Sequence, residues 1–134
     1  MDKRICVDMS CSILHHGHVR LLKKASKFGR VIVALTSDSE IKKYKNITPE
    51  LNFKRRKEIL ESIKYVSKVI KSNFNITEKF LKKNKLDLLV HGHDNTNKIS
   101  RQKLLIFKRT SRISSTEIRK ISYKNIKIIR KMKY

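Results

Sequence analysis

Two histidines, His15 and His18, lie between an apolar segment and an amphipathic one. Residues 4–8 are predicted to be a buried strand, and residues 19–28 have the apolar spacing of a helix. Residues three apart share a helix face, so both imidazoles can point the same way at a helix N-terminus, where backbone N–H groups and the helix dipole favour an anion. Gly17 would let a ligand approach the backbone. This arrangement predicts a phosphate site and does not resemble the site of a serine or cysteine nucleophile.

The same motif has two blander explanations. Histidines at the start of a helix are often only solvated caps, and a four-residue motif has false positives. A zinc site would need three or four ligands with supporting hydrogen bonds, and the chain has no CxxC or HExxH pattern. Phosphate binding and a plain helix start are equally compatible with the motif alone, so the rest of the chain has to decide.

Strand-like and helix-like segments alternate along the chain. Expected strands cover residues 4–8, 30–36, 65–70, 86–91 and 104–107, and expected helices cover residues 19–28, 37–43, 53–64 and 76–84. The alternation predicts one α/β domain over residues 1–134, with a five-stranded parallel sheet and helices on both faces. Ligands bind such sheets at the carboxyl ends of the strands, where the strand order reverses. If the first and fourth strands are neighbours, the histidine motif and residues 92–94 line one crevice.

A second candidate anion site lies in residues 109–118. Ser114 and Glu117 have the S-x-x-E spacing of a capping box, so a helix is predicted to begin there. Hydroxyl groups and the first N–H groups of that helix suit an anion, and Arg109 and Arg112 add positive charge suited to phosphate. A plain capped surface helix is the commoner cause of S-x-x-E taken alone.

Charge is the strongest feature of the composition. The 34 Lys and Arg residues against 11 Asp and Glu give a net charge of +23, which implies acidic partners such as nucleotides, nucleic acid or an anionic membrane surface. The lysines are spread over almost every segment and aromatic residues are few, so we expect no specific nucleic-acid site. No apolar run approaches the ~20 residues of a membrane span, and we see no signal peptide. With Cys6 and Cys11 as the two cysteines, reduced thiols in a cytoplasmic protein are expected.

Residues 123–134 are predicted to form a basic amphipathic helix with Ile126, Ile128, Ile129 and Met132 on its apolar side. We expect this helix to pack Ile126 and Ile129 on the domain or on a partner subunit and to leave its lysines in water. The alternative is an anionic surface, a membrane or nucleic acid, held by the lysines while apolar residues insert.

Together these motifs resemble the small cytidylyltransferases of the nucleotidyltransferase superfamily, namely glycerol-3-phosphate cytidylyltransferase and relatives associated with phosphonate metabolism. The resemblance covers residues 4–121. Residues 15–18 match the family's H-x-G-H, and residues 109–116 match its R-T-x-G-I-S-[ST]-T signature. Arg56 lies in a segment similar to the family helix that carries a nucleotide-side arginine. Residues 9–15 look more like the phosphonate-associated members.

The resemblance implies a homodimeric enzyme with the Rossmann-like nucleotidyltransferase fold, which transfers CMP from CTP to a small phosphorylated alcohol or phosphonate and releases pyrophosphate. Mg²⁺ is expected as a companion of CTP, without a metal site made of protein ligands. The catalytic residues would be His15, His18 and Lys45. The nucleotide-binding residues would be Met9, Ser10, Gly17, Arg56, Gly92, Asp94, Arg109, Thr110, Ile113, Ser114, Ser115 and Thr116. Ser12 and His93 would lie on the acceptor side.

The chain departs from the family pattern at three places. Ser12 replaces an aspartate, residues 92–94 read Gly-His-Asp where the family has Gly-Asp-Asp, and Arg112 replaces a glycine. These departures leave open a catalytically weak or inactive homologue that still binds nucleotide. The H-x-G-H motif does not choose the base, so an adenylyltransferase also stays open. A basic nucleic-acid-binding protein is the least favoured alternative.

Overall fold

A computed structural model describes residues 2–92, 95–108 and 110–132. Its regular elements are β1 (Arg4–Met9), α1 (His16–Ser26), β2 (Arg30–Thr36), α2 (Asp38–Lys45), α3 (Phe53–Glu61), β3 (Lys68–Ser72), α4 (Glu78–Lys83), β4 (Leu88–Gly92), the 3₁₀ helix η1 (Arg101–Lys103), β5 (Leu104–Phe107) and α5 (Ser115–Met132).

The strands form one five-stranded sheet in the order β3-β2-β1-β4-β5, and every neighbouring pair is parallel. The predicted Rossmann-like α/β fold is therefore confirmed. β1 lies at the centre, with β2 on one side and β4 on the other, and Val7 of β1 faces Val90 of β4 in the register. The strand order reverses between β1 and β4, which is where a ligand crevice is expected.

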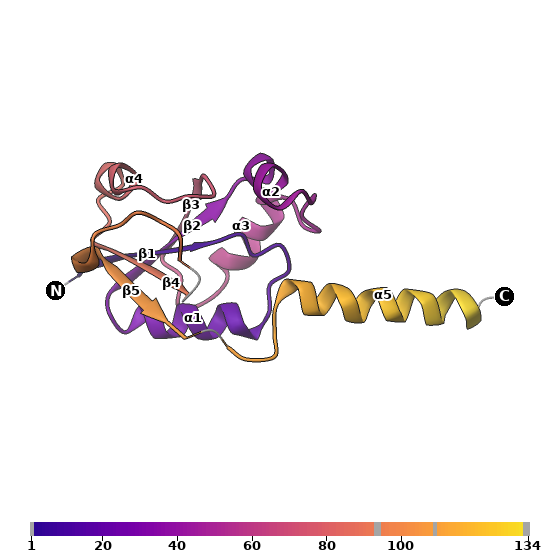
Figure 1. The fold of residues 1–134 in the computed structure, drawn as a ribbon. Coiled ribbons are helices and arrows are strands. Elements are labelled where there is room, and N and C mark those ends of the chain that lie inside the picture. Colours follow the sequence, from indigo (N-terminus) through magenta and orange to yellow (C-terminus); the bar gives the residue numbers. More distant parts are fainter. Residues whose placement is uncertain (1, 93–94, 109, 133–134) are drawn as a thin grey trace.

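Apolar side chains cover both faces of the sheet. On one face Val33 packs in a cluster with Leu22 of α1 and Leu60 of α3. On the other face Ile32, the neighbouring residue of β2, packs in a cluster that includes Leu81 of α4. Consecutive strand residues thus point to opposite buried layers, which explains why β2 is apolar throughout rather than alternating. Helices accordingly lie on both faces, as predicted (Figure 1).

The boundaries of two strands differ from the prediction. β3 begins at Lys68 rather than Tyr65, because Tyr65 and Val66 pack on the core from the turn that precedes the strand. β4 begins two residues later than predicted, because Leu86 lies in a turn, with its N–H donating to the carbonyl of Leu81. Apolar residues that reach the core from a turn resemble strand residues in the sequence. α2 also runs two residues further than predicted, and α3 ends three residues earlier.

The helix predicted to begin at Ser114 and the basic helix predicted for residues 123–134 form one continuous helix, α5. Figure 1 shows α5 leaving the body of the domain and extending away from it. Ile126 and Ile129 are 50% and 59% exposed, so the expectation that they pack on the domain is wrong. Every described residue from 120 onward is exposed, because the helix axis carries these residues past the edge of the sheet. None of the helices in the described ranges is long and apolar enough to span a bilayer.

Candidate active site

A cavity of about 630 Å³ lies at the carboxyl ends of the strands. Its wall includes Met9 and Thr36, the last residues of β1 and β2, together with Gly92 and Phe107, the last residues of β4 and β5. The start of α1 and the start of α5 complete the wall. The cavity therefore occupies the reversal point of the sheet, and it brings together the two segments predicted to bind anions.

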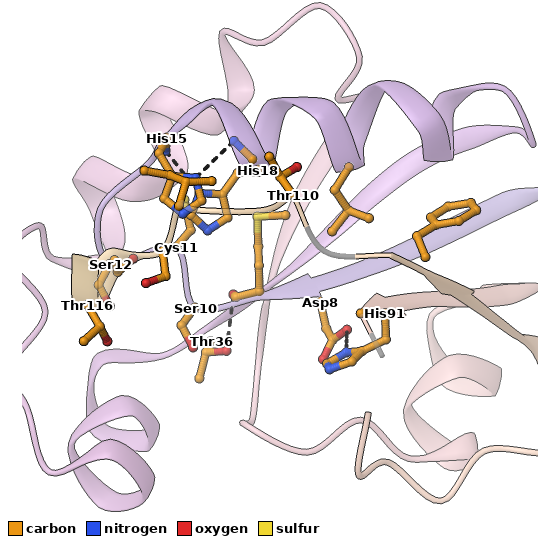
Figure 2. A pocket seen from close by; sticks show the side chains of 18 of the residues that line it. Asp8, Ser10, Cys11, Ser12, His15, His18, Thr36, His91, Thr110 and Thr116 are labelled. Atoms are coloured by element: carbon orange, nitrogen blue, oxygen red, sulfur yellow. Dashed lines mark hydrogen bonds and ion pairs between the residues drawn. The ribbon is translucent and has the colours of Figure 1, made fainter. Parts of the chain in front are cut away.

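His15 and His18 form a folded pair at the start of α1 (Figure 2). His15 is the N-cap residue, and its Nδ1 accepts the backbone N–H of Gly17 at 3.1 Å. Nδ1 of His18 accepts the backbone N–H of His15 at 3.1 Å, and the two ring centroids are 3.9 Å apart. Because each Nδ1 accepts a hydrogen bond, the neutral form of each ring carries its proton on Nε2. The pair can therefore present two N–H donors from adjacent rings beside a helix N-terminus.

Gly17 has a different role from the predicted one. A Cβ at this position would lie 2.8 Å from Cε1 and 2.9 Å from Nδ1 of His15, and 3.3 Å from Cγ2 of Ile113. The space beside the glycine is thus occupied by the His15 imidazole rather than kept for a ligand. Glycine is needed here because the cap ring folds back over the first turn of α1.

The start of α5 forms the second anion-binding wall. The hydroxyl of Ser114 accepts the backbone N–H of Glu117 at 3.1 Å, which confirms that a capped helix begins there. The hydroxyl of Ser115 donates to the carbonyl of Ile13 at 3.4 Å, and this bond ties the start of α5 to the loop before α1. Residues Ser114 to Thr116 all line the cavity. Two helix N-termini therefore contribute to one cavity, an arrangement that favours negative charge.

Positive side chains dominate the cavity wall. Its described residues include five cations and one carboxylate, namely Arg20, Lys24, Lys45, Lys108 and Arg119 against Asp8. Arg119 is held by Glu50, whose carboxylate accepts from Nε at 2.5 Å and from Nη2 at 2.7 Å. The Arg119 guanidinium lowers the pKa of Glu50 through these hydrogen bonds, and Glu50 in turn raises the pKa of Arg119. The electrostatics of the wall suit a ligand with several negative charges.

Asp8 and His91 form a second pair on another side of the cavity from the His15–His18 pair (Figure 2). Nδ1 of His91 lies 2.6 Å from Oδ1 of Asp8, whose side chain is 7% exposed. The residues come from neighbouring strands, β1 and β4, and both line the cavity. The sequence prediction missed this pair. The available signals were a carboxylate at the end of an apolar strand and a histidine directly before Gly92, both near the predicted reversal point.

Arg56 is buried beneath the site instead of lining it. Its side chain is 1% exposed, and its Nη1 donates to the carbonyls of Ser10 and Thr36 at 2.7 and 2.9 Å. Nε donates to the carbonyl of Leu51, and Nη2 donates to Asp38 Oδ1 at 2.6 Å. These bonds hold together the carboxyl ends of β1 and β2. The predicted contact of Arg56 with a nucleotide stays a prediction, since the described guanidinium binds protein groups.

The two cysteines are reduced and buried. Burial raises the pKa of the Cys6 thiol, and it raises the pKa of Cys11 to about 12. Cys11 lines the cavity, yet at neutral pH it is a neutral thiol and a poor nucleophile. The site therefore has the character of a binding and orienting surface, as the sequence indicated.

Most predicted site residues lie together in the cavity wall. Those that line it are Met9, Ser10, Ser12, His15, Gly17, His18, Lys45, Gly92, Thr110, Ile113, Ser114, Ser115 and Thr116. His93, Asp94 and Arg109 lie outside the described residues. Within the described ranges, no group of three or more His, Cys, Asp and Glu side chains could hold a metal ion.

Comparison with known proteins now identifies the family. The family model described as cytidylyltransferase-like matches residues 11–121. The chain belongs to the cytidylyltransferase-like family. Among its relatives, glycerol-3-phosphate cytidylyltransferase of Staphylococcus aureus is 31% identical over 126 residues, which cover 90% of this chain and 96% of the relative. Ethanolamine-phosphate cytidylyltransferase of Dictyostelium discoideum is 30% identical over 93 residues, 68% of this chain and 26% of that protein.

Solved structures agree on the fold of this cytidylyltransferase-like protein. A lipopolysaccharide core biosynthesis protein from Thermoplasma volcanium superposes with a TM-score of 0.69 at 20% identity, over 81% of this chain and 98% of that one. The family resemblance inferred from the motifs is thus confirmed, and the chain is an enzyme of the nucleotidyltransferase superfamily.

One departure from the family signature has a clear backbone consequence. Arg112, which stands where the signature has glycine, has φ of 60°, in the left-handed region that glycine adopts without cost. A residue with a Cβ gives up roughly 1–2 kcal/mol in this conformation. The Arg112 side chain is exposed and is not among the residues that line the cavity. The turn before α5 thus keeps the conformation that suits glycine even though arginine occupies the position.

Proposed function

We propose that this protein transfers CMP from CTP to a small phosphorylated alcohol or phosphonate and releases pyrophosphate. The observation that carries the proposal is the His15–His18 pair, held by its Nδ1 atoms at the N-terminus of α1 inside a cationic cavity. The relatives named as glycerol-3-phosphate and ethanolamine-phosphate cytidylyltransferases support both the nucleotide and the class of acceptor.

In the proposed reaction, an oxygen of the acceptor's phosphate or phosphonate attacks the α-phosphorus of CTP. A new P–O bond forms there, and the bond from the α-phosphorus to the bridging oxygen breaks, so that the electron pair leaves with pyrophosphate. Such a displacement depends on positioning and charge stabilisation rather than on a covalent enzyme intermediate. The absence of an activated cysteine or serine from the described cavity wall is compatible with this chemistry.

The His15–His18 pair and Lys45 are assigned to the α- and β-phosphates, where negative charge develops. Each Nε2–H is a donor that the hydrogen bond at Nδ1 has already oriented, and a donor placed in this way contributes about 2.7–4 kcal/mol to lowering the barrier. Thr110 and Ser114–Thr116 would hold the β- and γ-phosphate oxygens at the start of α5. The remaining cations of the wall would neutralise the triphosphate.

The Asp8–His91 pair is assigned to the acceptor side, together with Ser12 and His93. An ionised Asp8 accepts the Nδ1–H of His91 and so fixes the orientation of the ring. His91 then faces the acceptor phosphate from the opposite side to the His15–His18 pair. Asp94 and Arg109 keep their predicted nucleotide contacts as part of this proposal.

Mg²⁺ is proposed to arrive with CTP. The described residues do not bring three potential protein ligands together, so the ion would be held by phosphate oxygens and water, which is the usual coordination of Mg²⁺ in nucleotide sites. It would supply further charge neutralisation to the leaving pyrophosphate. A homodimer is proposed on the family resemblance alone.

The test is a pyrophosphate-release screen in which CTP and ATP are each paired with glycerol 3-phosphate, ethanolamine phosphate and a simple alkylphosphonate. We expect release with CTP and at least one acceptor, and loss of release in the His18→Ala variant. Release with ATP alone would replace the proposal with an adenylyltransferase. Tight CTP binding without release from any acceptor would replace it with an inactive nucleotide-binding homologue.

A further inference from the structure

The exposed part of α5 carries apolar side chains that the domain does not cover. Ile121, Ile126, Ile128, Ile129 and Met132 are between 50% and 82% exposed, and we call these five residues the apolar face of α5. Five isolated exposed residues would need no explanation, but these five lie within twelve residues of one helix. Clustered exposed apolar surface marks an interaction site.

The cations of the same segment lie on the other side of the helix. At 3.6 residues per turn, the apolar face spans an arc of about 160° around the helix axis. Lys120, Lys124, Lys127, Arg130 and Lys131, which we call the basic face, fall in a separate arc of about 120°. Residues 118–132 contain no acidic residue. This segregation is the pattern of a helix that lies in the plane of a membrane interface.

We propose that α5 docks this protein on an anionic lipid surface. The apolar face would sit at the boundary between headgroups and acyl chains, and the basic face would contact lipid phosphates. α5 is about 27 Å long, and because no described helix can cross a membrane, the contact lies in the plane of one leaflet. Since α5 begins at the cavity wall with Ser115, the docked surface would lie within one helix length of the active site.

Charge complementarity favours lipid over a second copy of the chain. Two copies that paired their apolar faces would bring two basic faces together without an acidic residue in either segment, and like charges at such seams are destabilising. Nucleic acid would satisfy the basic face but would leave the apolar face in water. An anionic lipid surface is the partner that accommodates both faces at once.

The first experiment measures co-sedimentation of the full chain with vesicles, and it needs neither CTP nor an acceptor, so its outcome is separate from that of the proposed reaction. Wild-type protein is expected to bind vesicles of phosphatidylcholine mixed with phosphatidylglycerol and not vesicles of pure phosphatidylcholine. High salt should weaken this binding. Equal binding to the two kinds of vesicle, or no binding to either, would overturn the proposal.

Two triple variants separate the contributions of the two faces. Ile121→Gln, Ile128→Gln and Ile129→Gln together should lower binding more than tenfold, because the apolar face is removed while glutamine preserves helix propensity. Circular dichroism verifies that the helix remains. The second variant combines Lys124→Gln, Lys127→Gln and Lys131→Gln. It should lower binding roughly a hundredfold, since each cation near an anionic surface contributes about fivefold.

A matched control places the same three charge changes on other exposed lysines. The variant with Lys54→Gln, Lys79→Gln and Lys83→Gln has the same net charge as the second variant, and its sites lie on α3 and α4 outside the cavity wall. We expect it to bind like the wild type. Equal losses in the control and in the α5 variant would show that diffuse charge is responsible and would overturn the proposal.

Two further outcomes would assign α5 to another partner. Polynucleotide binding that is lost with the lysine variant but unchanged with the isoleucine variant, in a protein that ignores vesicles, would point to nucleic acid. A dimer in analytical ultracentrifugation that the isoleucine variant converts to monomer, again without vesicle binding, would assign the apolar face to a second copy. Either result would refute docking on lipid.

Discussion

Replacing Gly17 by alanine should separate the placement of the His15 ring from the stability of the fold. The new Cβ would lie 2.8 Å from Cε1 of His15, so the ring must move and its bond to the N–H of residue 17 must break. Losing this cap destabilises the helix by about 0.5–2 kcal/mol, whereas exchanging glycine for alanine in a helix stabilises it by up to about 1 kcal/mol. We therefore expect the free energy of unfolding to change by no more than ~1 kcal/mol.

Turnover should respond far more strongly than stability. A displaced His15 no longer donates to the transition state, which is worth about 10²–10³-fold in rate. Pyrophosphate release gives the turnover of Gly17→Ala, and urea unfolding gives its stability. His15→Ala should lose a similar factor, and the double variant should be no slower than His15→Ala, because both changes remove one interaction. Wild-type turnover in Gly17→Ala, or losses that multiply in the double variant, would refute the role given to the ring.

Three other predictions follow from the site. His18→Ala should lower turnover by about 10²–10³-fold, while His16→Ala should change it little, because His16 is exposed and outside the cavity wall; equal losses would reject this assignment. Arg56→Met should lower the free energy of unfolding by about 3–5 kcal/mol, because it removes hydrogen bonds to buried backbone carbonyls at two strand ends; urea unfolding with an unchanged midpoint would contradict this. Arg119 holds the pKa of Glu50 below its ordinary value of 4.5, so the stabilisation from this ion pair is complete at neutral pH and is lost as pH falls through the lowered pKa. The difference in thermal stability between wild type and Glu50→Gln should therefore shrink on acidification, and a constant difference would exclude the effect.

Local patterns were sufficient to predict the sheet and the two anion-binding walls. The strand at residues 30–36 is apolar throughout, and it is observed as β2 with those bounds. The start of α5 was visible because the capping pattern of Ser114 is contained within four residues. These features depend on neighbours in the chain, so sequence spacing records them directly.

Features that depend on tertiary contacts were not predictable in this way. Asp8 and His91 are 83 positions apart, and only the adjacency of β1 and β4 brings them together. Arg56 follows another arginine in a charged stretch, and the phase of α3 decides which of the two turns inward. The apolar side of α5 was visible in the sequence, but the spacing of its residues does not determine whether the domain covers them.

The central position of β1 has a consequence for biosynthesis. β1 is the first strand to leave the ribosome, and it pairs early with β2, but its other edge has to wait for β4. At roughly 5–20 residues per second, synthesis of residues 37–92 takes several seconds, during which that edge is open to incorrect pairing with other chains. The Asp8–His91 pair forms only when β4 docks, so a nascent chain that ends before residue 91 holds the histidine motif and part of the core without a complete site. Protection of the growing chain by a chaperone would matter most in this interval.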